Sequence, residues 1–401
     1  MTRPRVVLAV TIDDSLQFLR GYPELLVERG WDVHVVSTPG VRLSELSVVQ
    51  GVTTHAINME RTPNPLRDIK GLFLWLRLIR RLRPDAVSVG TPKAGLLGTL
   101  AAWIMRVPAR IYLLRGLRLE TSSGIRRRLL ALAERVAMAS ASSVVAVSHS
   151  LADLAASMHL ASATKIQVLG LGSSNGVDTK EFRPGRIDAA SLRELAARVG
   201  IDLTIPVIGF VGRLTRDKGL HVLADAVKTL QNDGMRVQVL LLGGVDDETG
   251  KLGLRLLKAT GSDVFAVGHV REPSAYYSLM SVLCLPSYRE GFVNVILEAS
   301  ASGVPVVASD ATGVRDAVVS GRTGLTSAVG DAPAMAANLA NILLNPALGR
   351  KLGANGREWV VANFERDTVQ TRYAQHLEAS LPPDARRRLA SRNGVRPATK
   401  R

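Results

Sequence analysis

Residues 282–299 read VLCLPSYREGFVNVILEA and contain one complete strand–loop–helix unit. The apolar run at 282–286 predicts a buried strand, because it is short and ends at a proline. A polar loop follows, and the apolar residues beyond it recur at helical spacing up to Glu298. A strand that is apolar on both faces and leads directly into a helix is typical of a parallel sheet covered by helices on both sides.

The same unit recurs along the chain in two series. Short apolar runs that alternate with helical patterns lie at 6–10, 33–37, 86–89, 111–114 and 144–147, and again at 207–211, 237–242, 264–267, 282–286 and 304–308. Between the two series, residues 170–178 contain three glycines, two serines and an asparagine, which mark a loop. We therefore predict an α/β protein of two doubly wound, Rossmann-like domains, residues 1–180 and 181–355.

The end of the chain has a different composition. Residues 356–381 form a helical pattern that includes Trp359 and Phe364, and we expect this stretch to pack back on the first domain. Residues 382–401 are rich in Pro, Arg and Ser and have little to bury. We expect them to form a disordered basic tail.

Composition narrows the class of protein. The 401 residues are 46% hydrophobic, and no window of eighteen uncharged apolar residues offers a membrane span. The single cysteine, Cys284, excludes an internal disulfide and favours reducing cytoplasm. Of the net charge of +16, +10 lies in residues 1–180 and +6 in residues 381–401. Aromatic residues make up only 4% and do not interleave with the basic runs, which argues against nucleic acid as a partner.

An anion site is predicted where the strand at 207–211 ends. Gly212 and Arg213 follow this strand directly, and Lys218 and Gly219 come just before a helix. The glycines permit close backbone approach, Arg213 can hold phosphate oxygens bidentately, and Lys218 supplies a point charge. A solvated basic loop is the alternative.

A second part of the site is predicted around the loop of the opening stretch. The backbone amides at Gly291, Phe292, Val293 and Asn294 would form a helix N-terminus aimed at a diphosphate. Glu298, about two turns into the helix, can accept hydrogen bonds from ribose hydroxyls, and Glu290 can contact sugar hydroxyls. The alternative is that Glu290 only complements the helix dipole and that Glu298 is an ordinary exposed glutamate.

These residues carry a resemblance to a known family. Glu290 and Glu298, with Pro286-Ser287 before them and Gly303-x-Pro305 after them, resemble the E-x7-E region of family-four retaining glycosyltransferases, which have the GT-B fold of two domains facing across a cleft. Further motifs follow in the family's order, so the resemblance covers about residues 5–375. They are Gly212-Arg213, Lys218-Gly219, Gly243-Gly244, Gly268-His269-Val270, Gly313 with Asp316, and Gly321-x-Thr323-Gly324.

The resemblance implies roles for the residues of the second half. Arg213 and Lys218 bind the donor diphosphate, Glu298 the ribose, and Glu290 the transferred sugar. The strand-end segments with Gly244, His269 and Val270 lie near the nucleoside base, for which uridine is favoured. The leaving phosphate itself takes the acceptor proton, so no protein base is assigned. Neither a metal nor a cofactor is expected, because cations and helix amides neutralise the diphosphate charge.

The first half resembles the subgroup that extends polyprenyl-diphosphate-linked sugars in bacterial glycan assembly. The resemblance rests on 91–98 (TPKAGLLG), 115–121 (RGLRLET) and 172–178 (GSSNGVD). Many family members have a histidine where this chain has Arg115, so a catalytic histidine is not transferred; Arg115 is instead expected to stabilise phosphate charge, to contact the acceptor, or to be structural. Lys93 and Arg118 join the acceptor side. Asp13, Asp14 and Ser15 replace the family's glycine pair, and either bind acceptor or cap the next helix.

A basic helix at 66–83 raises the question of a membrane. Helical winding places Ile69, Leu72 and Leu76 on one side and Lys70, Arg77 and Arg80 on the other, while Phe73 and Leu74 fall among the basic residues. Bulky apolar groups among cations suit an anionic lipid surface, although a core helix with a solvated face is the alternative. We therefore expect a cytoplasmic protein held peripherally on the inner face of the cell membrane.

Two other functions remain open. A nucleotide-sugar epimerase has the same architecture and binds a UDP-sugar, but needs acidic and basic side chains for elimination. A membrane-associated scaffold could retain a donor site without catalysis. Release of UDP from the donor, with and without an acceptor, separates these possibilities.

Overall fold

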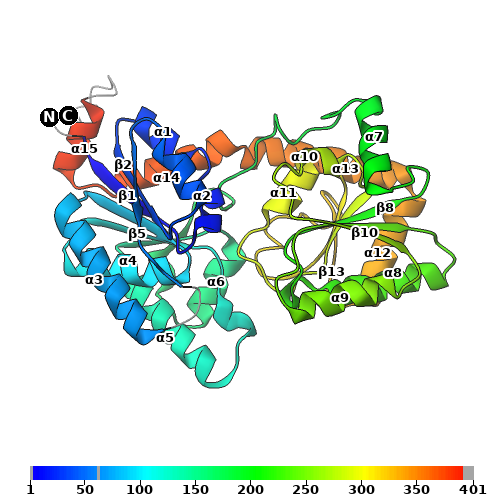
Figure 1. Ribbon diagram of the computed structural model, residues 1–401, viewed down its shortest axis with the longest axis horizontal. Coiled ribbons are helices and arrows are strands. Elements are labelled where there is room, and N and C mark those ends of the chain that lie inside the picture. The colour runs from blue at the N-terminus through cyan, green and yellow to red at the C-terminus, as the bar shows by residue number, and fades with distance from the viewer. Residues whose placement is uncertain (1–2, 61–63, 392–401) are drawn as a thin grey trace. The chain divides into compact units, whose positions relative to one another are not determined.

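The computed structural model describes residues 3–60 and 64–391, which form two compact units (Figure 1). The first unit contains the chain up to Asn175 and again from Val369 onward, and the second contains Gly176–Thr368. The chain therefore leaves the first unit once and returns to it near its end.

The first unit is built on a parallel sheet of seven strands in the order β3-β2-β1-β4-β5-β6-β7. The strands are β1 Arg5–Ala9, β2 Asp32–Ser37, β3 Val52–Ala56, β4 Ala86–Gly90, β5 Ala109–Leu114, β6 Ser143–Ala146 and β7 Ile166–Val168. The order reverses beside β1, which pairs with both β2 and β4. At such a switch point the loops after neighbouring strands separate and leave room for a ligand.

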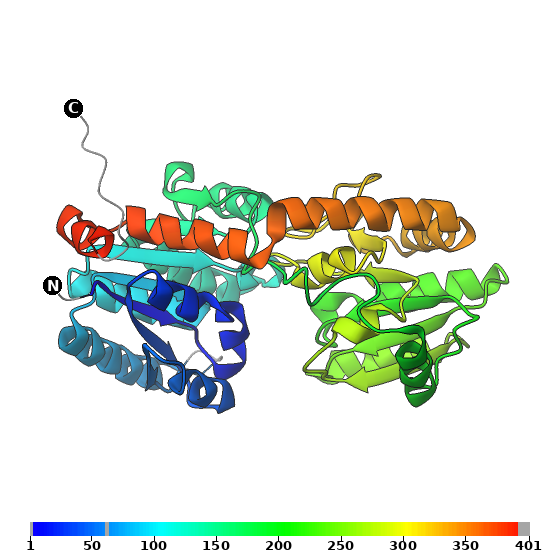
Figure 2. The same ribbon diagram turned by 90° about the horizontal axis from the view of Figure 1, so that it is seen from above.

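Helices cover both faces of this sheet (Figures 1 and 2). One layer contains α1 Tyr22–Glu28, α2 Val41–Ser47, α14 Arg366–Ala379 and α15 Pro383–Ala390, with the 3₁₀ helix η1 Asp13–Leu19. The other contains α3 Pro65–Leu82, α4 Pro92–Ile104, α5 Gly124–Ser140 and α6 His149–Ser157. Two short 3₁₀ turns, η2 Arg118–Thr121 and η3 Ala163–Lys165, connect elements. Apolar residues of α14 and α15, including Leu377 and Leu389, complete the core beneath α1.

The second unit has a parallel sheet of six strands in the order β10-β9-β8-β11-β12-β13. The strands are β8 Val207–Val211, β9 Gln238–Leu242, β10 Asp263–Gly268, β11 Val282–Leu285, β12 Val306–Ser309 and β13 Leu325–Ser327. Its helices are α7 Ala189–Val199, α8 Leu220–Asn232, α9 Glu248–Lys258, α10 Ser274–Tyr277, α11 Asn294–Ala301, α12 Ala332–Leu344 and α13 Pro346–Phe364, with the 3₁₀ turn η4 Arg216–Lys218. Helix α8 packs against α9 and α12, and α11 packs against α13. The predicted α/β architecture of two doubly wound units is confirmed.

The end of the chain differs from the prediction. The stretch expected to pack on the first unit is divided, because α13 packs in the second unit and only residues from Val369 onward belong to the first. The expectation of a disordered tail from residue 382 is wrong for its first ten residues, which include α15. Pro383 begins this helix, and Ala385 and Leu389, four residues apart, are both buried. The polar and basic composition of the segment gave no indication that these two apolar residues would be buried together. Residues 392–401 lie outside the described part of the chain.

Within residues 3–60 and 64–391, no helix is both long enough and apolar enough to cross a bilayer.

Candidate active site

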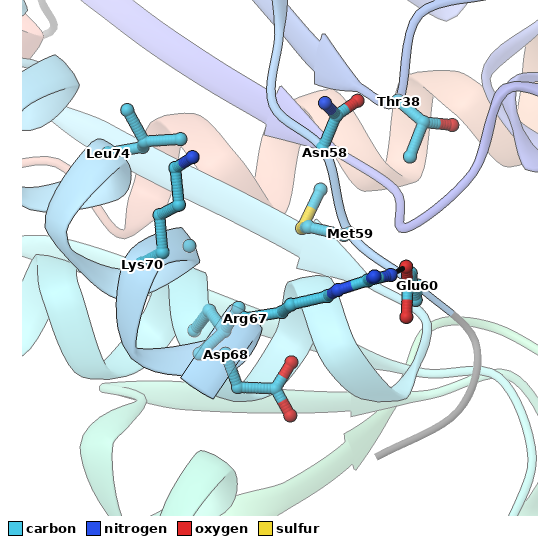
Figure 3. A pocket seen from close by; sticks show the side chains of 10 residues that line it. Thr38, Asn58, Met59, Glu60, Arg67, Asp68, Lys70 and Leu74 are labelled. Atoms are coloured by element: carbon cyan, nitrogen blue, oxygen red, sulfur yellow. Dashed lines mark ion pairs between the residues drawn. The ribbon is translucent and has the colours of Figure 1, made fainter. Parts of the chain in front are cut away.

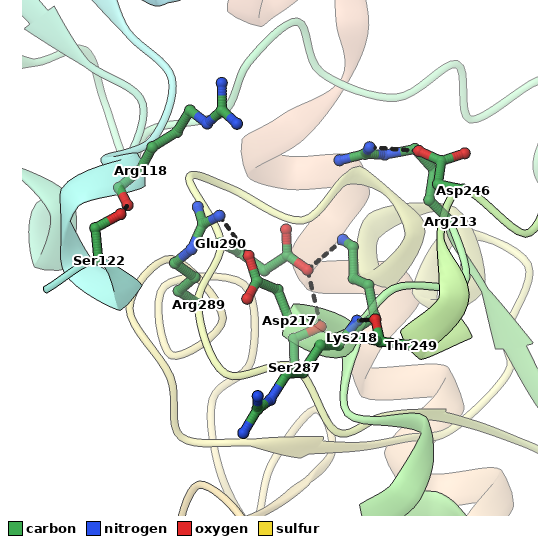
Figure 4. Close-up of polar contacts among 11 residues, drawn as sticks. Arg118, Ser122, Arg213, Asp217, Lys218, Asp246, Thr249, Ser287, Arg289 and Glu290 are labelled. Atoms are coloured by element: carbon green, nitrogen blue, oxygen red, sulfur yellow. Dashed lines mark hydrogen bonds and ion pairs between the residues drawn. The ribbon is translucent and has the colours of Figure 1, made fainter. Parts of the chain in front are cut away.

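The carboxyl edge of the second sheet brings Lys218 and Glu290 together (Figure 4). Strands β8 and β11 pair directly, so the loops that follow them meet. The Lys218 ammonium lies 2.5 Å from Glu290 Oε1, and Ser287 Oγ donates a hydrogen bond to the same oxygen at 2.8 Å. Both charged side chains are largely shielded from solvent. The result is one carboxylate held between an ammonium and a hydroxyl.

The two loops are fastened to each other by further contacts. The Tyr288 amide donates to the Asp217 carbonyl at 2.8 Å, and the Arg289 guanidinium pairs with the Asp217 carboxylate at 2.5 Å. Gly219 has a φ of +71°, and a Cβ at this position would lie 2.1 Å from the Pro286 carbonyl oxygen. Gly219 is therefore required for the close approach of the two loops, which in turn places Lys218 beside Glu290.

The glycines at the ends of β8, β9 and β10 have different environments. Gly243 has a φ of +142°, and a Cβ there would lie 1.9 Å from the Gly212 carbonyl oxygen. At Gly244 and Gly268, by contrast, an added Cβ would meet no atom of residues 3–60 and 64–391 within 4 Å. Gly243 thus joins the two strand ends, while the backbone at Gly244 and Gly268 faces open space.

The other predicted residues of this edge are solvent-accessible. Arg213 is exposed, and its guanidinium pairs with Asp246 at 2.6 Å. His269 is exposed and Val270 is half-buried, directly after the end of β10. Because β8, β9 and β10 are neighbours in the sheet, these side chains belong to one edge.

Helix α11 begins at Asn294, after a segment whose side chains are buried. Phe292 and Val293 are both buried, and the Phe292 ring packs against Phe364 with centroids 5.5 Å apart. A donor could therefore reach only their backbone. Gly313 supports this turn, since a Cβ there would lie 2.4 Å from the Gly291 carbonyl oxygen.

Glu298 lies one turn into α11 rather than two, because the helix begins later than the sequence indicated. Its carboxylate accepts a hydrogen bond from the Tyr277 hydroxyl at 2.7 Å. Burial, and then the Glu298 charge, raise the pKa of Tyr277 well above its ordinary value, so this hydroxyl stays a donor. Glu298 is half-buried and oriented, unlike an ordinary exposed glutamate.

In the first unit, Arg115 follows β5 and is half-buried. Its guanidinium lies 5.0 Å from the centre of the Phe18 ring and donates a hydrogen bond to the Ser174 carbonyl at 3.1 Å. Burial lowers its pKa, whereas the Tyr373 and Tyr22 hydroxyls raise it. Arg115 Nε is buried, and the described residues offer it no hydrogen-bond partner.

The expectation that Asp13, Asp14 and Ser15 cap the next helix is wrong. The Asp13 carboxylate instead accepts hydrogen bonds from the amides of Arg42 and Leu43, at 3.1 and 2.8 Å, and so caps α2, which lies further along the chain. Asp13, Asp14 and Ser15 themselves lie in the 3₁₀ helix η1, and the side chain of Ile12, the residue before η1, does not cap it. Asp14 is exposed and Ser15 half-buried.

Lys93 is the ion-pair partner of Asp68, which lines a pocket at the start of α3 (Figure 3). Its ammonium pairs with Asp68 at 2.7 Å. The pocket, of about 360 Å³, lies between the loops after β2 and β3 and the first half of α3, and its polar lining includes Thr38, Asn58, Glu60, Arg67, Asp68 and Lys70. An ion pair joins Arg67 to Glu60. Arg118, in contrast, is exposed on η2.

Sequence reasoning missed several residues that fix these sites. Ser287 orients Glu290 and Asp217 ties the two loops, although both lie inside motifs that had been recognised. Thr11 and Thr91 share a hydrogen bond of 2.8 Å, and Thr11 Oγ1 also accepts from the Ala94 amide at the start of α4. Thr91 has a φ of +73°, which its residue type gives no reason to expect.

Comparison with known proteins shows which protein family this chain resembles. Residues 17–172 match the family described as "Glycosyl transferase 4-like domain", and residues 205–345 match "Glycosyl transferases group 1". The chain is 36% identical over 370 residues to the capsular polysaccharide biosynthesis glycosyltransferase CapM of Staphylococcus aureus, covering 92% of this chain and 95% of CapM.

Solved structures share the fold. A glycosyltransferase from Rickettsia africae superposes with a TM-score of 0.79 at 17% identity, covering 95% of this chain and 99% of that one. HepE of Anabaena, in complex with UDP-glucose, gives 0.78 at 19% identity, covering 94% and 99%. With these matches over both units, the chain belongs to the family-four (GT4) glycosyltransferases, which have the GT-B fold.

Proposed function

We propose that this chain is a retaining glycosyltransferase that moves a hexose or N-acetylhexosamine from a UDP-sugar to a polyprenyl-diphosphate-linked sugar or another glycan acceptor. The observation that carries the proposal is the pairing of Lys218 with Glu290 at the carboxyl edge of the second sheet. A cation there can balance diphosphate charge, and the carboxylate can accept hydrogen bonds from sugar hydroxyls. The name of the relative CapM, a protein of capsular polysaccharide biosynthesis, supports a role in assembling cell-surface polysaccharide.

The donor would lie along the strand ends of the second unit. Lys218, Arg213 and the backbone amides that open α11 would hold the diphosphate, because helix N-termini and cations both favour negative charge. Glu298, oriented by Tyr277, would accept hydrogen bonds from the ribose hydroxyls. The base would occupy the open space beside Gly244 and Gly268. Lys218, Arg213 and these amides would share the diphosphate charge, and we propose that neither a metal nor a cofactor takes part.

The chemistry is an exchange of one bond at the anomeric carbon. The bond from this carbon to the diphosphate oxygen breaks, and a bond to the acceptor oxygen forms on the same face of the sugar. The acceptor's proton passes to the departing phosphate oxygen, which leaves as nucleoside diphosphate. Negative charge grows on that oxygen as the bond breaks, and Lys218 and Arg213 would stabilise it without any side chain acting as a base.

We assign the acceptor to the first unit. Arg115 is a half-buried cation whose guanidinium donates to the Ser174 carbonyl and lies over the Phe18 ring, so its charge is suited to an acceptor phosphate. Lys93 and Arg118 would add charge at the same edge. A lipid-linked acceptor remains in the bilayer, so the enzyme would work peripherally on the cytoplasmic face of the membrane.

The test is a transfer assay in which the protein is mixed with UDP-sugars, with and without a polyprenyl-diphosphate-linked sugar, in the presence of EDTA. We expect slow UDP release that the acceptor accelerates, and a product whose anomeric configuration, read by NMR, matches the donor. An epimerised or hydrolysed sugar formed at the same rate without acceptor would identify an epimerase. Tight donor binding without UDP release would identify a scaffold, and either result contradicts the proposal.

A further inference from the structure

Helix α3 presents apolar side chains to solvent on the face opposite its buried side. Leu66, Ile69 and Phe73, spaced three and four residues apart, form one stripe, with Leu66 81% and Phe73 67% exposed. Trp75 and Ile79 are buried on the other side. The sequence groups Ile69 on one side with Leu72 and Leu76, and of these three Ile69 is exposed while the other two are half-buried.

Helix α5 repeats this arrangement. Ile125, Leu129 and Leu132 follow one another at spacings of four and three residues, and Ile125 and Leu129 are 75% and 63% exposed. The buried residues of α5, among them Ala137 and Met138, lie on the opposite side. Two helices of one unit therefore each carry an outward apolar stripe, which is more than the scattered exposed apolar residues of an ordinary surface.

Both stripes belong to the same helical layer. Helix α4 packs against α3 and against α5, and Figure 1 shows the three helices below the first sheet. Near its end α4 adds exposed Trp103 and Ile104. We call the outward side of α3, α4 and α5 the lower face.

The charge of the lower face is almost entirely positive. Helices α3, α4 and α5 together contain ten Lys and Arg residues but only two carboxylates. One of these, Asp68, is paired with Lys93, and the other, Glu134, is buried against the Tyr112 hydroxyl. The cations beside the stripes, including Lys70, Arg77 and Arg126–Arg128, thus have few competing anions on their own helices.

We propose that the lower face docks on an anionic lipid bilayer, with the stripes of α3 and α5 entering the boundary between headgroups and acyl chains. Apolar residues interspersed with Arg and Lys match that boundary, because the cations can reach lipid phosphates while the apolar groups leave water. A second copy of the chain is a poorer occupant, since a symmetric pairing would set one basic face against another. The inference builds on the proposed lipid-linked acceptor but concerns a different surface.

The experiment is co-sedimentation of the full chain with vesicles of equal parts phosphatidylglycerol and phosphatidylcholine, or of phosphatidylcholine alone. I69S/F73S and I125S/L129S remove one stripe each. L252S/L256S removes two exposed apolar residues from α9 in the second unit and serves as the matched control. A second pair compares R126Q/R127Q/R128Q with R193Q/R198Q/R350Q, which removes three exposed arginines from the second unit.

We expect the wild type and both controls to bind the anionic vesicles, and each lower-face variant to bind about tenfold more weakly. Equal binding to phosphatidylcholine alone, or wild-type binding by the stripe variants, would overturn the proposal. So would stripe variants that change the oligomeric state in ultracentrifugation and leave vesicle binding intact. Transfer to a water-soluble acceptor analogue should be unchanged in all of them. If the wild type bound vesicles but did not transfer sugar to this analogue, the proposed function would be refuted and the docking surface would stand.

Discussion

The Glu290 carboxylate is held in place by contacts to one of its oxygen atoms. One of its carboxylate oxygens receives both the Lys218 ammonium and the Ser287 hydroxyl, so its position is fixed before any sugar arrives. A preorganised group of this kind contributes most to the step in which charge develops.

Replacing Glu290 with Gln is therefore expected to lower kcat by about 10²–10³-fold and to change the donor KM only a few-fold. The amide keeps the hydrogen bond from Ser287 but loses the charge that positions Lys218. E248Q, which alters an exposed glutamate of α9, is the matched control and should behave as wild type. Steady-state kinetics of UDP release test this; equal kcat values for E290Q and E248Q would remove Glu290 from the mechanism.

Glu134 provides a pH-dependent contribution to stability. Burial raises its pKa from 4.5 to about 7, partly offset by the hydrogen bond from Tyr112. The neutral form is thus favoured in the folded protein, and stability is lost as pH rises from about 4.5 through 7. The shift corresponds to about 3 kcal/mol.

We expect E134Q to remove this component. In urea unfolding, the wild type should lose stability relative to E134Q between pH 5 and pH 8, by an amount of the order of that shift. The isosteric amide keeps a partner for the Tyr112 hydroxyl, so the comparison isolates the charge. Parallel pH profiles for the two proteins would show that Glu134 ionises normally.

At the scale of elements, the strand ends of the second unit are held by glycine contacts. Gly243 and Gly244 are adjacent in sequence, yet only Gly243 lies against backbone and has a positive φ. Substitutions at these two glycines can therefore be compared to measure how much the close backbone contact at Gly243 contributes to stability.

G243A should lower the free energy of unfolding by at least about 2 kcal/mol, because its Cβ would overlap the Gly212 carbonyl. G244A should change it by less than about 0.5 kcal/mol, since its Cβ points into open space. Urea denaturation measures both. Similar losses for the two variants would mean that the close contact at Gly243 does not matter for stability.

The elements also show where sequence reasoning succeeds and where it stops. The strands at 207–211 and 282–286 could be predicted because their apolar runs are local, and their shared edge followed from parallel topology. The Asp13 cap of α2 could not, because it joins residues about thirty positions apart. Ser287 was visible in a motif, but its hydrogen bond to Glu290 depends on a turn that the residue types do not specify.

In the molecule as a whole, the last part of the chain packs into the first unit, where the chain began. The ends of α14 and α15 complete a core begun by β1 and α1, and Arg388 pairs with Asp85 at 2.5 Å. Such closure depends on contacts between residues about 300 positions apart, so composition alone predicted disorder there.

L389A is accordingly expected to destabilise the protein by about 2–5 kcal/mol, the usual cost of truncating a buried leucine. R387A, two residues earlier on the exposed side of α15, is the control and should be near neutral. Thermal unfolding compares them. If L389A were as stable as R387A, α15 would contribute nothing to the core.

Lys218 and Glu298 are the two residues through which we propose that the second unit binds a nucleotide-sugar. Isothermal titration of UDP into the wild type, K218A, E298A and the exposed-lysine control K228A tests this proposal most directly. We predict that the wild type and K228A bind alike, and that K218A and E298A each bind at least about tenfold more weakly, as expected for the loss of a charge-assisted contact. Equal affinity in all four proteins, or no binding of UDP to the wild type, would show that Lys218 and Glu298 do not form a nucleotide-sugar site.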